Sequence, residues 1–598
     1  MCRIAGIINP SLPIADIKAK VGEMCLLQKH GGPDDEGFYT SEKHSLVFGH
    51  RRLALIDLSP GGHQPMSYAN ERYHITYNGE LYNYPELKEE LIMAGFRFST
   101  QSDTEVILAA FAAWGRQAFG KFNGMYAFAL WDTQTENVYL VRDPSGIKPL
   151  YYAITKQGLA FASETRALRS IPDLNEASPH WQIYLMAYGH LPEPVTTLKE
   201  VKPLTKGCFI RYHVPSQKWD MEVFGYYSFI EKLDNREEVI AGIREKLLAG
   251  VKRHLLSDAP IGVFLSGGID SSIVALLAKK VHSSELKTLS IVFNESKYSE
   301  QTYQDLMVKQ LNCDHHRYLL QENEFHQLLP GILQVMDQPS CDGINTWFIS
   351  KSAKENGLKA VLSGIGGDEL FGGYPSFRRI GAALRLAALP NTLLRSGRYS
   401  ASKKIRRLAY LSIPGPVGMY LFLRGLHSPR KISEHLGVSE SEVLNILSEQ
   451  PILSSIRYQT PKNQASWIET NLYMQNQLLR DSDVMSMAHG IEIRVPFLDA
   501  EFVKYVLAIQ SEIKFAGTAD KQLLVDSFRN ELPEPVWKRD KMGFSFPFAE
   551  WLINNEMVKD VLLSAGKKGE TVYEEFSRGK IHWSQMMTMF LWYNQPDA

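Results

Sequence analysis

Cys2 is the first residue whose type and place in the chain could do chemistry. Once the initiator methionine is removed, this residue carries a thiol and a free α-amine together. An α-amine has a reference pKa of about 8, so it can act as general base for the thiol of the same residue, and no separate histidine is required. A cysteine near a chain start can equally be an accident, so position alone leaves both interpretations open.

Several polar residues further along could complete a site for free glutamine. The Asn78 side-chain NH2 and the Gly79 backbone N–H could form an oxyanion hole for a tetrahedral intermediate. Arg52 could bind a carboxylate through two parallel hydrogen bonds. Glu80 and Asp103 could receive a substrate ammonium group. Each residue could instead be a turn or surface residue, but together they predict a site for one carboxylate, one ammonium and one scissile amide.

A second group of residues near the middle of the chain predicts phosphate binding. The apolar run Pro260–Leu265 leads into the glycine- and serine-rich segment Ser266–Ser272 and then into a helical pattern that ends at Val281. A strand, a glycine turn and a helix N-terminus make an anion site, because unpaired backbone N–H groups point at the ligand. The spacing is not that of a kinase-type P-loop, and the lysine of that motif is missing. The predicted phosphate-binding residues of this loop are Ser266, Gly267, Gly268, Asp270 and Ser271.

Another glycine-rich loop, residues 363–374, follows a short apolar run and supports the same interpretation. Asp270 and Asp368 could jointly hold Mg²⁺ against the phosphates, since hard cations prefer carboxylate oxygens. Lys521 could stabilise the charge that develops on phosphate during catalysis. A phosphate-bearing ligand with Mg²⁺ is therefore expected here, and the family resemblance described below implies that this ligand is ATP.

The elements that must position these residues change character along the chain. Residues 1–215 show short strand patterns with one helical stretch near Thr104–Trp114, which predicts an α+β domain rich in antiparallel sheet. A polar stretch at 216–236 is interpreted as a linker. Residues 237–598 alternate helical patterns with short apolar strands, which predicts an α/β domain with a parallel sheet and helical C-terminal additions.

Composition narrows the classes of protein. The 598 residues are 44% hydrophobic and 22% charged, with a net charge of −1, which is ordinary for a globular protein and gives no signal for nucleic-acid binding. The five cysteines form no metal-ligand or disulfide pattern. No segment has the length of a membrane span, and no signal-peptide pattern is present, so a cytoplasmic location is expected.

The first domain resembles the class II glutamine amidotransferases. The resemblance is carried by Met1-Cys2, His30–Asp34, Tyr77–Glu80 and Ser102–Glu105, and by the segment Arg142–Tyr152, which is similar to the segment closing that domain in asparagine synthetases. It implies an N-terminal-nucleophile fold, with two antiparallel sheets packed between helices, and glutaminase activity at Cys2.

The second domain resembles the ATP-pyrophosphatase domain of glutamine-hydrolysing asparagine synthetases, and the similarity extends through Arg480–Asp499. It implies that a carboxylate is adenylated by ATP and then amidated by ammonia from glutamine, most simply aspartate to asparagine. AMP, pyrophosphate and glutamate are the implied by-products, and a dry passage would carry the ammonia. Further positions matching those that hold AMP in this family are Leu265, Phe293, Ser363 and Gly364.

Four positions depart from the family pattern. Gly31 stands where relatives usually carry arginine, which is expected to loosen a structural ion pair, and Arg3 stands where many carry glycine. Ile365 replaces a common glutamate on the acceptor side, and an aliphatic group can neither relay a proton nor bind an ammonium. Val484 replaces a basic residue. The acceptor is therefore left open between aspartate and another carboxylate, such as a sugar uronate or a cell-wall or natural-product acid.

The mostly helical stretch at about 372–470 is unusually basic, because no acidic residue occurs between Glu369 and Glu434. It could be a helical subdomain with solvated arginines, or it could help bind a large or anionic acceptor. Two other classes are also weighed: a carboxylate-activating cyclase or ligase with a vestigial first domain, and a non-catalytic scaffold. The intact residues of both sites argue against each. A homodimer is left open as the state of assembly.

Overall fold

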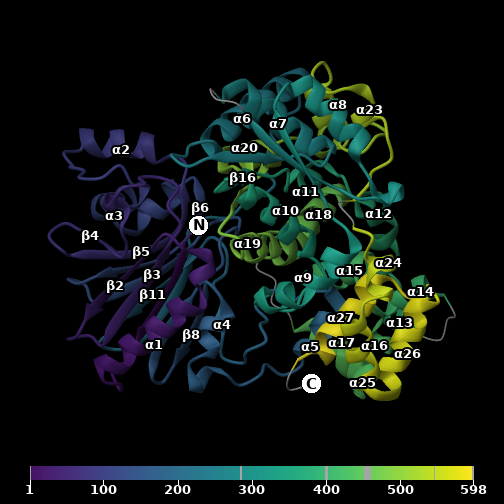
Figure 1. Cartoon of the computed structure of the whole chain (residues 1–598), viewed down its shortest axis with the longest axis horizontal. Helices are drawn as coiled ribbons and strands as arrows, with labels where there is room; N and C mark the ends of the chain where they lie inside the picture. The colour runs from purple at the N-terminus through teal and green to yellow at the C-terminus, as the bar shows by residue number, and fades with distance from the viewer. Residues whose placement is uncertain (1, 283–285, 397–401, 450–458, 544–545, 596–598) are drawn as a thin grey trace.

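The computed structural model describes residues 2–282, 286–396, 402–449, 459–543 and 546–595 (Figure 1). The first 223 residues form a β-rich part that is purple and blue in Figure 1, and the remainder forms a larger, mainly helical part around a parallel sheet. The change in architecture falls where the sequence pattern changes from strands to alternating helices and strands.

Two antiparallel sheets of six strands each form the first part. The first sheet has the order β10-β8-β9-β1-β3-β2 and the strands Lys202–Pro203, Tyr151–Thr155, Gly158–Ala162, Arg3–Ile8, Leu46–Arg52 and Asp35–Ser41. The second has the order β12-β11-β7-β6-β5-β4 and the strands Lys218–Val223, Cys208–His213, Asn137–Arg142, Gly124–Asp132, Tyr73–Leu81 and Met66–Tyr68.

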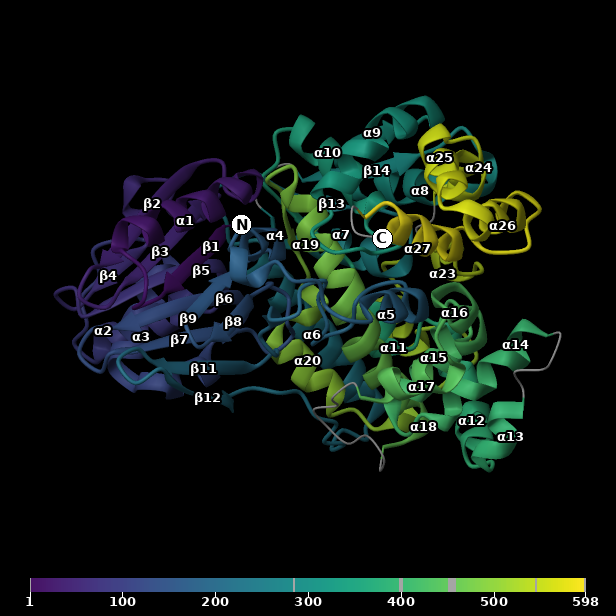
Figure 2. The same cartoon turned by 90° about the horizontal axis from the view of Figure 1, so that it is seen from below.

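The two sheets pack face to face, and helices cover their outer faces. Side chains of β1 and β3 in one sheet and of β6 and β7 in the other form a single buried cluster between them. Helices α1 (Ile14–Leu27) and α4 (Thr165–Arg169) cover the first sheet, while α2 (Tyr84–Met93) and α3 (Asp103–Trp114) cover the second. This layered arrangement, visible in Figure 2, confirms the predicted antiparallel sheets between helices.

The second sheet extends further along the chain than predicted, and this moves the start of the linker. The linker was predicted to begin at residue 216, but Lys218–Val223 forms β12 and pairs with β11 from Cys208↔Val223 to His213↔Lys218. An edge strand pairs on one side only and buries little. Here three charged residues alternate with Trp219, Met221 and Val223, and these three apolar side chains are exposed. The connection to the second part therefore spans residues 224–235, and α6 (Arg236–His254) begins directly after it.

The second part is built on a five-stranded parallel sheet with the order β15-β14-β13-β16-β17. Its strands are Asp314–Leu319, Lys287–Val292, Ile261–Phe264, Ala360–Leu362 and Glu492–Arg494. Because all five strands run in one direction, the loops after β13 and β16 emerge at the same edge of the sheet. The predicted phosphate loops follow these two neighbouring strands.

Helices surround this sheet. Besides α6 they include α7 (Ile269–Val281), α8 (Gln301–Leu311), α9 (Glu322–Val335), α10 (Ile344–Glu355), α11 (Gly367–Phe371), α19 (Arg480–Met487), α20 (Ala500–Leu507), α21 (Ser511–Lys514), α22 (Gln522–Phe528) and α23 (Glu534–Trp537). The predicted basic insertion is helical, with α12 (Pro375–Ala387), α13 (Asn391–Ser396), α14 (Lys403–Arg406), α15 (Pro416–Arg424), α16 (Pro429–Leu436), α17 (Glu440–Ser448), α18 (Pro461–Ile468) and a π-helical stretch at Glu469–Leu479.

The chain ends in four helices, α24 (Phe548–Ile553), α25 (Glu556–Ser564), α26 (Gly566–Ser577) and α27 (Trp583–Tyr593), drawn in yellow in Figure 1. Helix α5 (Trp181–Tyr188) belongs to the first 223 residues but packs against α16 and α27. Its buried side chains join the large apolar core of the second part. The two parts are therefore joined by a continuous core, and sequence boundaries do not separate them in space.

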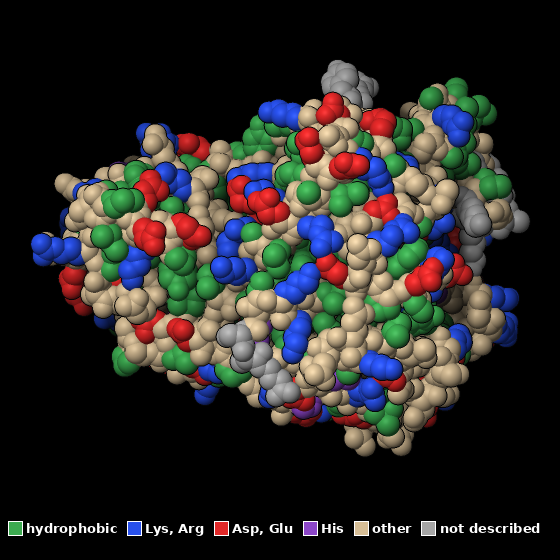
Figure 3. Space-filling model, turned by 90° about the horizontal axis from the view of Figure 1, so that it is seen from above, with side chains coloured by type: hydrophobic (Ala, Val, Ile, Leu, Met, Phe, Trp, Pro, Cys, Tyr) green, Lys and Arg blue, Asp and Glu red, His purple; other side chains and the backbone are tan. Residues whose placement is uncertain are grey.

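In the described part of the chain, no helix is both long and apolar enough to cross a membrane. All five cysteines are free thiols. On the face drawn in Figure 3, basic and acidic side chains of the described residues are interspersed, which agrees with the net charge of −1.

Candidate active sites

Cys2 is buried immediately before β1, and its Sγ atom lies 3.9 Å from the carbonyl oxygen of Leu53. Burial raises the pKa of the Cys2 thiol to about 11. The thiol is therefore protonated near neutral pH, and a base must take its proton as the sulfur attacks a substrate.

Strand β5 lies against β1 and β3 and carries the predicted oxyanion hole. Thr76 connects these strands: its Oγ1 donates to the Gly49 carbonyl at 3.2 Å and lies 3.1 Å from His50 Nδ1. Both polar atoms of the neighbouring Asn78 side chain are buried and have no hydrogen-bond partner among the described residues. A Cβ atom on Gly79 would meet the Met125 carbonyl oxygen at 2.1 Å, so only glycine fits this position of the sheet. Asn78 is thus free to bind a ligand.

Arg52, Glu80 and Asp103, the three charged residues predicted to bind glutamine, all contact other groups of the protein. Backbone carbonyls hold the buried Arg52 guanidinium, with Nη1 3.1 Å from the Ser59 oxygen and Nη2 3.4 Å from the Ile56 oxygen. Glu80 Oε2 lies 3.4 Å from an arginine of the second part, Arg494. Burial raises the pKa of Glu80 well above its ordinary value, the negative charge of a neighbouring glutamate adds to this, and the arginine opposes it.

Asp103 is the first residue of α3, directly after the capping Ser102. Its Oδ2 accepts hydrogen bonds from the Tyr77 hydroxyl at 3.0 Å and the Leu81 backbone N–H at 2.9 Å, both in β5. Burial raises the pKa of this carboxyl to about 6. These contacts fix the strand that carries Asn78 and Gly79 against the start of α3.

The first phosphate loop runs from β13 to the start of α7 and is held by its own serines. The Ser266 hydroxyl accepts from the Gly268 N–H at 3.3 Å and lies 3.0 Å from the Ser271 hydroxyl. Gly267 has φ +81°, and a Cβ there would lie 3.0 Å from Tyr303 Cβ, which favours glycine. The loop thus presents the N-terminus of a 13-residue helix, α7, to the sheet edge.

The second loop approaches the first so closely that glycines are required. A Cβ on Gly364 would lie 2.9 Å from the Ser271 backbone nitrogen, and one on Gly367 would lie 2.5 Å from Asp270 Cγ. This contact brings together the two predicted metal-facing carboxylates. Lys521 lies between them, with its Nζ 2.7 Å from Asp270 Oδ2 and 2.7 Å from Asp368 Oδ1.

The same cluster contains a lysine that the sequence did not reveal. Lys541 Nζ lies 2.7 Å from Asp368 Oδ2, so that carboxylate is held between two lysines. Burial opposes ionisation of Asp368, but Lys521 and Lys541 hold its pKa at about 2. In contrast, burial raises the pKa of Asp270, although Lys521 counteracts part of this effect. Lys541 lies in an irregular segment without a recognisable motif, and only the folded structure places it here.

A cavity of about 1180 Å³ opens over the two loops. The predicted residues that line it are Leu265, Ser266, Gly268, Asp270, Ser271, Ser363, Gly364, Asp368 and Lys521. Gly267 and Phe293 are absent from the described lining. The Phe293 side chain packs in the core with its ring centroid 4.9 Å from that of Phe546 and 5.9 Å from that of Trp551.

The far side of the cavity contains groups that sequence reasoning did not assign. Arg424 donates to Glu469 Oε2 at 2.7 Å and stacks on the Tyr473 ring at 3.6 Å. The buried carboxyl of Glu369 accepts from the Tyr374 hydroxyl at 2.7 Å, and burial with the nearby Asp368 charge raises its pKa to about 7. These residues come from the helical insertion or from the start of the segment that leads into it, which therefore forms one wall of the cavity.

Arg494 connects the two candidate sites. Its guanidinium binds Glu80 at 3.4 Å and Glu492 at 2.6 Å, while its backbone carbonyl accepts from the Ser363 N–H at 2.8 Å. All of these groups except Ser363 are buried. A side chain of the predicted glutamine site is thus separated by one residue from the second phosphate loop.

The substitutions noted in the sequence have different structural settings. Ile365 is partly buried and lines the cavity, whereas Val484 is buried in α19 and is absent from the described lining. A Cβ on Gly31 would lie 2.8 Å from Arg3 Cγ and Nε. The Arg3 side chain therefore fills the space next to residue 31 and makes ion pairs of its own, so the expected loosening is not seen here.

The carboxylates fit a Mg²⁺ ion that also binds phosphate. Asp270 Oδ1 is buried without a hydrogen-bond partner among the described residues, and Asp368 faces the same space. Within the ranges that the structure describes, no group of three or more His, Cys, Asp or Glu residues could hold a metal. Mg²⁺ commonly takes one or two protein carboxylates and completes its shell with phosphates and water, which matches this donor set.

Acidic residues neutralise part of the basic stretch, two from its C-terminal portion and two from later in the chain. Arg378 pairs with Asp520, Arg424 with Glu469, Arg430 with Glu434 and Lys431 with Glu575. Arg378 and Arg379 also line the cavity. Arg398 and the side chains of Lys403 and Lys404 lie outside the described residues.

Comparisons with known proteins agree with this division. Residues 242–582 match the family model described as asparagine synthase, and residues 1–224 match the model described as a glutamine amidotransferase domain. The chain is 33% identical over 581 residues to glutamine-hydrolysing asparagine synthetase 1 of Bacillus subtilis, covering 94% of this chain and 90% of the relative.

Two further relatives, one of them named as an amidase, are also similar to the chain. A putative glutamine-hydrolysing asparagine synthetase of Mycobacterium bovis is 30% identical over 592 residues, which cover 92% of this chain and 88% of the relative. The protein named amidase chry2 of Gibberella zeae is 26% identical over 571 residues, covering 87% and 84%.

Proposed function

The chain belongs to the asparagine synthase family of glutamine-dependent carbon–nitrogen ligases, and we propose that it converts aspartate to asparagine with ATP and glutamine. The observation that carries this proposal is the pairing of two sites in one chain. A buried cysteine at the start of β1 and an unpartnered Asn78 on the adjacent strand β5 suit glutamine, and a glycine-loop cavity with Asp270, Lys521 and Asp368 suits a nucleotide.

In the glutaminase step, the Cys2 sulfur attacks the side-chain amide carbon of glutamine. The proton of the thiol passes to the α-amine of the same residue and then to the leaving ammonia. Asn78 and the Gly79 N–H stabilise the oxyanion, Arg52 binds the substrate carboxylate, and Glu80 and Asp103 receive its ammonium group. Water then hydrolyses the thioester to glutamate and restores Cys2.

In the synthetase step, the acceptor carboxylate attacks the α-phosphorus of ATP and pyrophosphate leaves at the Ser266–Ser272 loop. Leu265, Ser363 and Gly364, which line the cavity, would hold the AMP portion together with Phe293, whose ring packs in the core. Mg²⁺ held by Asp270 and Asp368 would offset phosphate charge, and Lys521 would stabilise the charge that develops. Ammonia attacks the acyl carbon, and AMP leaves with the former carboxylate oxygen.

Ammonia must reach the second site unprotonated. In neutral water it is mostly ammonium, which is not a nucleophile, so a dry route through the protein would be an advantage. The buried groups around Arg494, between Glu80 and Ser363, lie where such a route would run. The continuous apolar core between the two parts supports the same assignment.

A different carboxylate is the second candidate acceptor. Ile365 lines the cavity where relatives commonly carry glutamate, and a volume of about 1180 Å³ leaves room beyond a nucleotide and one small amino acid. The similarity to a relative named as an amidase also fits an acceptor other than aspartate.

A carboxylate screen tests the proposal. Purified enzyme would receive ATP, Mg²⁺, glutamine and one acid at a time, with pyrophosphate release and the mass of the amide product as readouts. Aspartate should give asparagine, with one pyrophosphate per amide. An amide formed only from another acid would replace aspartate as acceptor. Pyrophosphate release without nitrogen transfer would indicate a cyclase or other ligase, and neither glutaminase nor pyrophosphate release would indicate a binding protein.

A further inference from the structure

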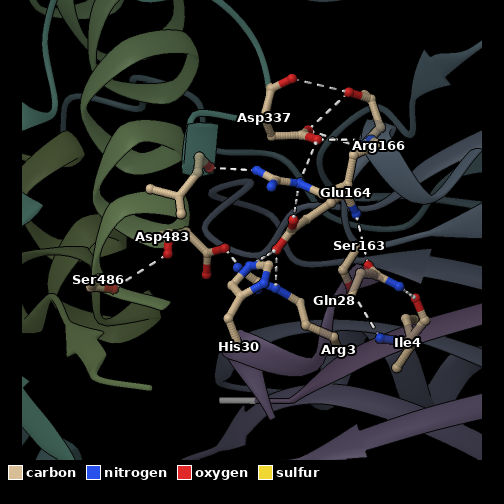
Figure 4. Close-up of polar contacts among 12 residues, drawn as sticks. Arg3, Ile4, Gln28, His30, Ser163, Glu164, Arg166, Asp337, Asp483 and Ser486 are labelled. Atoms are coloured by element: carbon tan, nitrogen blue, oxygen red, sulfur yellow. Dashed lines mark hydrogen bonds and ion pairs between the residues drawn. The ribbon is translucent and has the colours of Figure 1, made fainter. Parts of the chain in front are cut away.

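Arg3 directly follows the nucleophile and contacts both parts of the molecule (Figure 4). Its Nε donates to Glu164 Oε1 at 2.8 Å, and its Nη1 lies 2.9 Å from Asp483 Oδ2. Glu164 precedes α4 in the amidotransferase part, whereas Asp483 lies on α19 of the synthetase part. One fully buried guanidinium therefore binds one carboxylate from each domain.

Glu164 is the centre of a larger group of charges in the amidotransferase part. His30 Nε2 lies 2.9 Å from Glu164 Oε1, and Arg166 Nε lies 2.8 Å from Oε2. Although burial opposes its ionisation, the positive charges of His30, Arg3 and Arg166 hold the pKa of Glu164 well below its usual range. The carboxylate is therefore charged at every pH of interest and keeps Arg3 in place.

Asp337 makes a second contact between the two parts. This residue follows α9 in the synthetase part, and its carboxylate accepts from the backbone N–H groups of Thr165 and Arg166 at 2.8 Å each. We name Arg3, His30, Glu164, Arg166, Asp337 and Asp483 the interdomain ion cluster. Figure 4 shows its members converging from both parts of the molecule.

Asp337 and Asp483, the two acids of the synthetase part, are close in sequence to residues that line the cavity. Asp483 shares the short helix α19 with Asp481 and Ser482, which line the cavity. Asp337 is followed by Ser340, whose hydroxyl donates to Asp481 Oδ2 at 2.5 Å, and by Asp342, which lines the cavity. A ligand that moves α19 would therefore also move Asp483, the partner of Arg3, and one that moves the other segment would move Asp337, the partner of Thr165 and Arg166.

Burial makes the ion cluster sensitive to such movement. Paired charges in a dry interior are held in a narrow geometry, and separating one partner leaves a costly unpaired charge. Arg3 is joined to Cys2 by one peptide bond at the start of β1, so no loop separates the residue that carries this guanidinium from the nucleophile.

From these contacts we propose that Arg3 is a positioning residue that couples occupancy of the nucleotide cavity to the reactivity of Cys2. The inference rests on the proposed function only in that ATP binds the cavity. ATP favours the arrangement of α19 in which Asp483 holds Arg3, and Arg3 then sets Cys2 for attack on glutamine. The effect is a difference in affinity between two arrangements, as coupling between sites requires.

The packing around Gly31 supplies a rescue variant. Because a Cβ on residue 31 would start 2.8 Å from the Arg3 side chain, both positions border one space. Arg3→Met removes the charge and keeps much of the volume. The double variant Arg3→Gly with Gly31→Arg returns a guanidinium to the space from the other position. Arg72→Met, which breaks a pair with Asp132 inside the amidotransferase part, is the matched control.

The experiment measures how ATP changes Cys2 in the full-length enzyme. Alkylation of Cys2 by iodoacetamide is followed by mass spectrometry of its peptide, with and without ATP and Mg²⁺, and glutaminase rates are recorded in parallel. In wild type, Arg72→Met and the double variant, ATP should change both rates by about fivefold or more, the lower end of typical coupling. In Arg3→Met the change should fall below about twofold, with the ATP-free rates retained.

Two results would overturn the inference: an ATP response in Arg3→Met equal to that of wild type, or no ATP response in wild type. If Arg3→Met does not fold, Asp483→Asn provides the same readout, since it removes only the synthetase-side carboxylate. Failure of every acceptor to give pyrophosphate would instead refute the proposed function, while the alkylation result would still decide the role of Arg3.

Discussion

The two sites of this enzyme differ in how their charged groups are held. In the amidotransferase part, Arg52 is bound by backbone carbonyls, and Asp103 accepts from the Tyr77 hydroxyl and the Leu81 N–H. In the synthetase part, charges bind one another in the series Asp270, Lys521, Asp368 and Lys541. Backbone partners stay in place when a substrate arrives, whereas side-chain partners can be exchanged for phosphates or a metal.

The supporting elements differ in the same sense. The groups proposed to bind glutamine lie on paired strands or at a helix start, in a buried setting that suits one small substrate. The groups proposed to bind nucleotide and acceptor lie mainly on loops after parallel strands, around a cavity walled by inserted helices. Loops and insertions tolerate sequence change better than strands do, so the acceptor side is where specificity can vary within this architecture.

Cys2→Ala is expected to have the largest effect and to separate the two regions completely. Glutamine-dependent amide synthesis should be abolished, because the nucleophile is lost, while synthesis from added ammonium salt should persist. Glutamate formation and amide formation are measured separately. Glutamine hydrolysis by Cys2→Ala at the wild-type rate would show that another residue is the nucleophile.

Lys521→Met breaks the charge series on the synthetase side alone. We expect pyrophosphate release to fall by about 10²–10³, the typical loss for a well-placed electrostatic contact, with basal glutaminase activity unchanged. Lys504→Met is a suitable control, because Lys504 pairs with Glu501 on the exposed surface of α20. Unaltered ATP turnover in Lys521→Met would remove this lysine from the site.

Much of this contrast could be predicted from sequence, because both sites contain local motifs. The strand β5 and the loop after β13 are contiguous segments with clear patterns, so the sequence alone is enough to predict Asn78 and Asp270 as ligand-binding residues; the structure leaves Asn78 without a hydrogen-bond partner among the described residues and puts Asp270 in the cavity lining. The helix at α3 was predicted almost to its ends, since Ser102 caps it and its apolar pattern is continuous.

The missed features depend on contacts between distant segments. Lys541 reaches Asp368 from an irregular segment 173 positions away, Arg494 joins Glu80 to the second loop, and Arg3 binds Asp483 across the interface. No periodicity or capping pattern encodes such pairings. Phe293 differs from these cases, because a local match predicts its role whereas its ring packs into the core, and its part in nucleotide binding stays a prediction.

A smaller effect is expected when the two arginines that line the cavity, Arg378 and Arg379, are neutralised. It would show whether the acceptor reaches this wall of the cavity. Arg378→Gln with Arg379→Gln should raise the acceptor KM by roughly three- to tenfold and leave the glutamine KM unchanged, if the acceptor is anionic. Increasing salt should weaken acceptor binding in wild type more than in the variant, because screening reaches about 8 Å at physiological ionic strength. Arg430→Gln, whose partner is the exposed Glu434, is the control. An unchanged acceptor KM at low and high salt would confine these arginines to a structural role.

The last expected effect concerns the free energy of unfolding rather than a reaction rate. It depends on Glu369, a buried carboxyl at the synthetase site, and Asp103 is the buried carboxyl of the other site with which it is compared. Burial raises the pKa of Glu369 to about 7 from an unfolded value near its reference of about 4.3. Between these values the unfolded chain loses a proton that the folded protein keeps, so this group reduces stability as pH rises and has no further effect above about 7. Glu369→Gln should remove that decline, and its stability relative to wild type should rise by about 3 kcal/mol between pH 4.5 and pH 7.5. Asp103, with its pKa raised only to about 6, acts equally in both proteins and cancels in the comparison.

Unfolding temperatures of wild type and Glu369→Gln across this pH range provide the measurement. A constant difference between the two proteins would mean that Glu369 is already ionised in the folded enzyme at low pH.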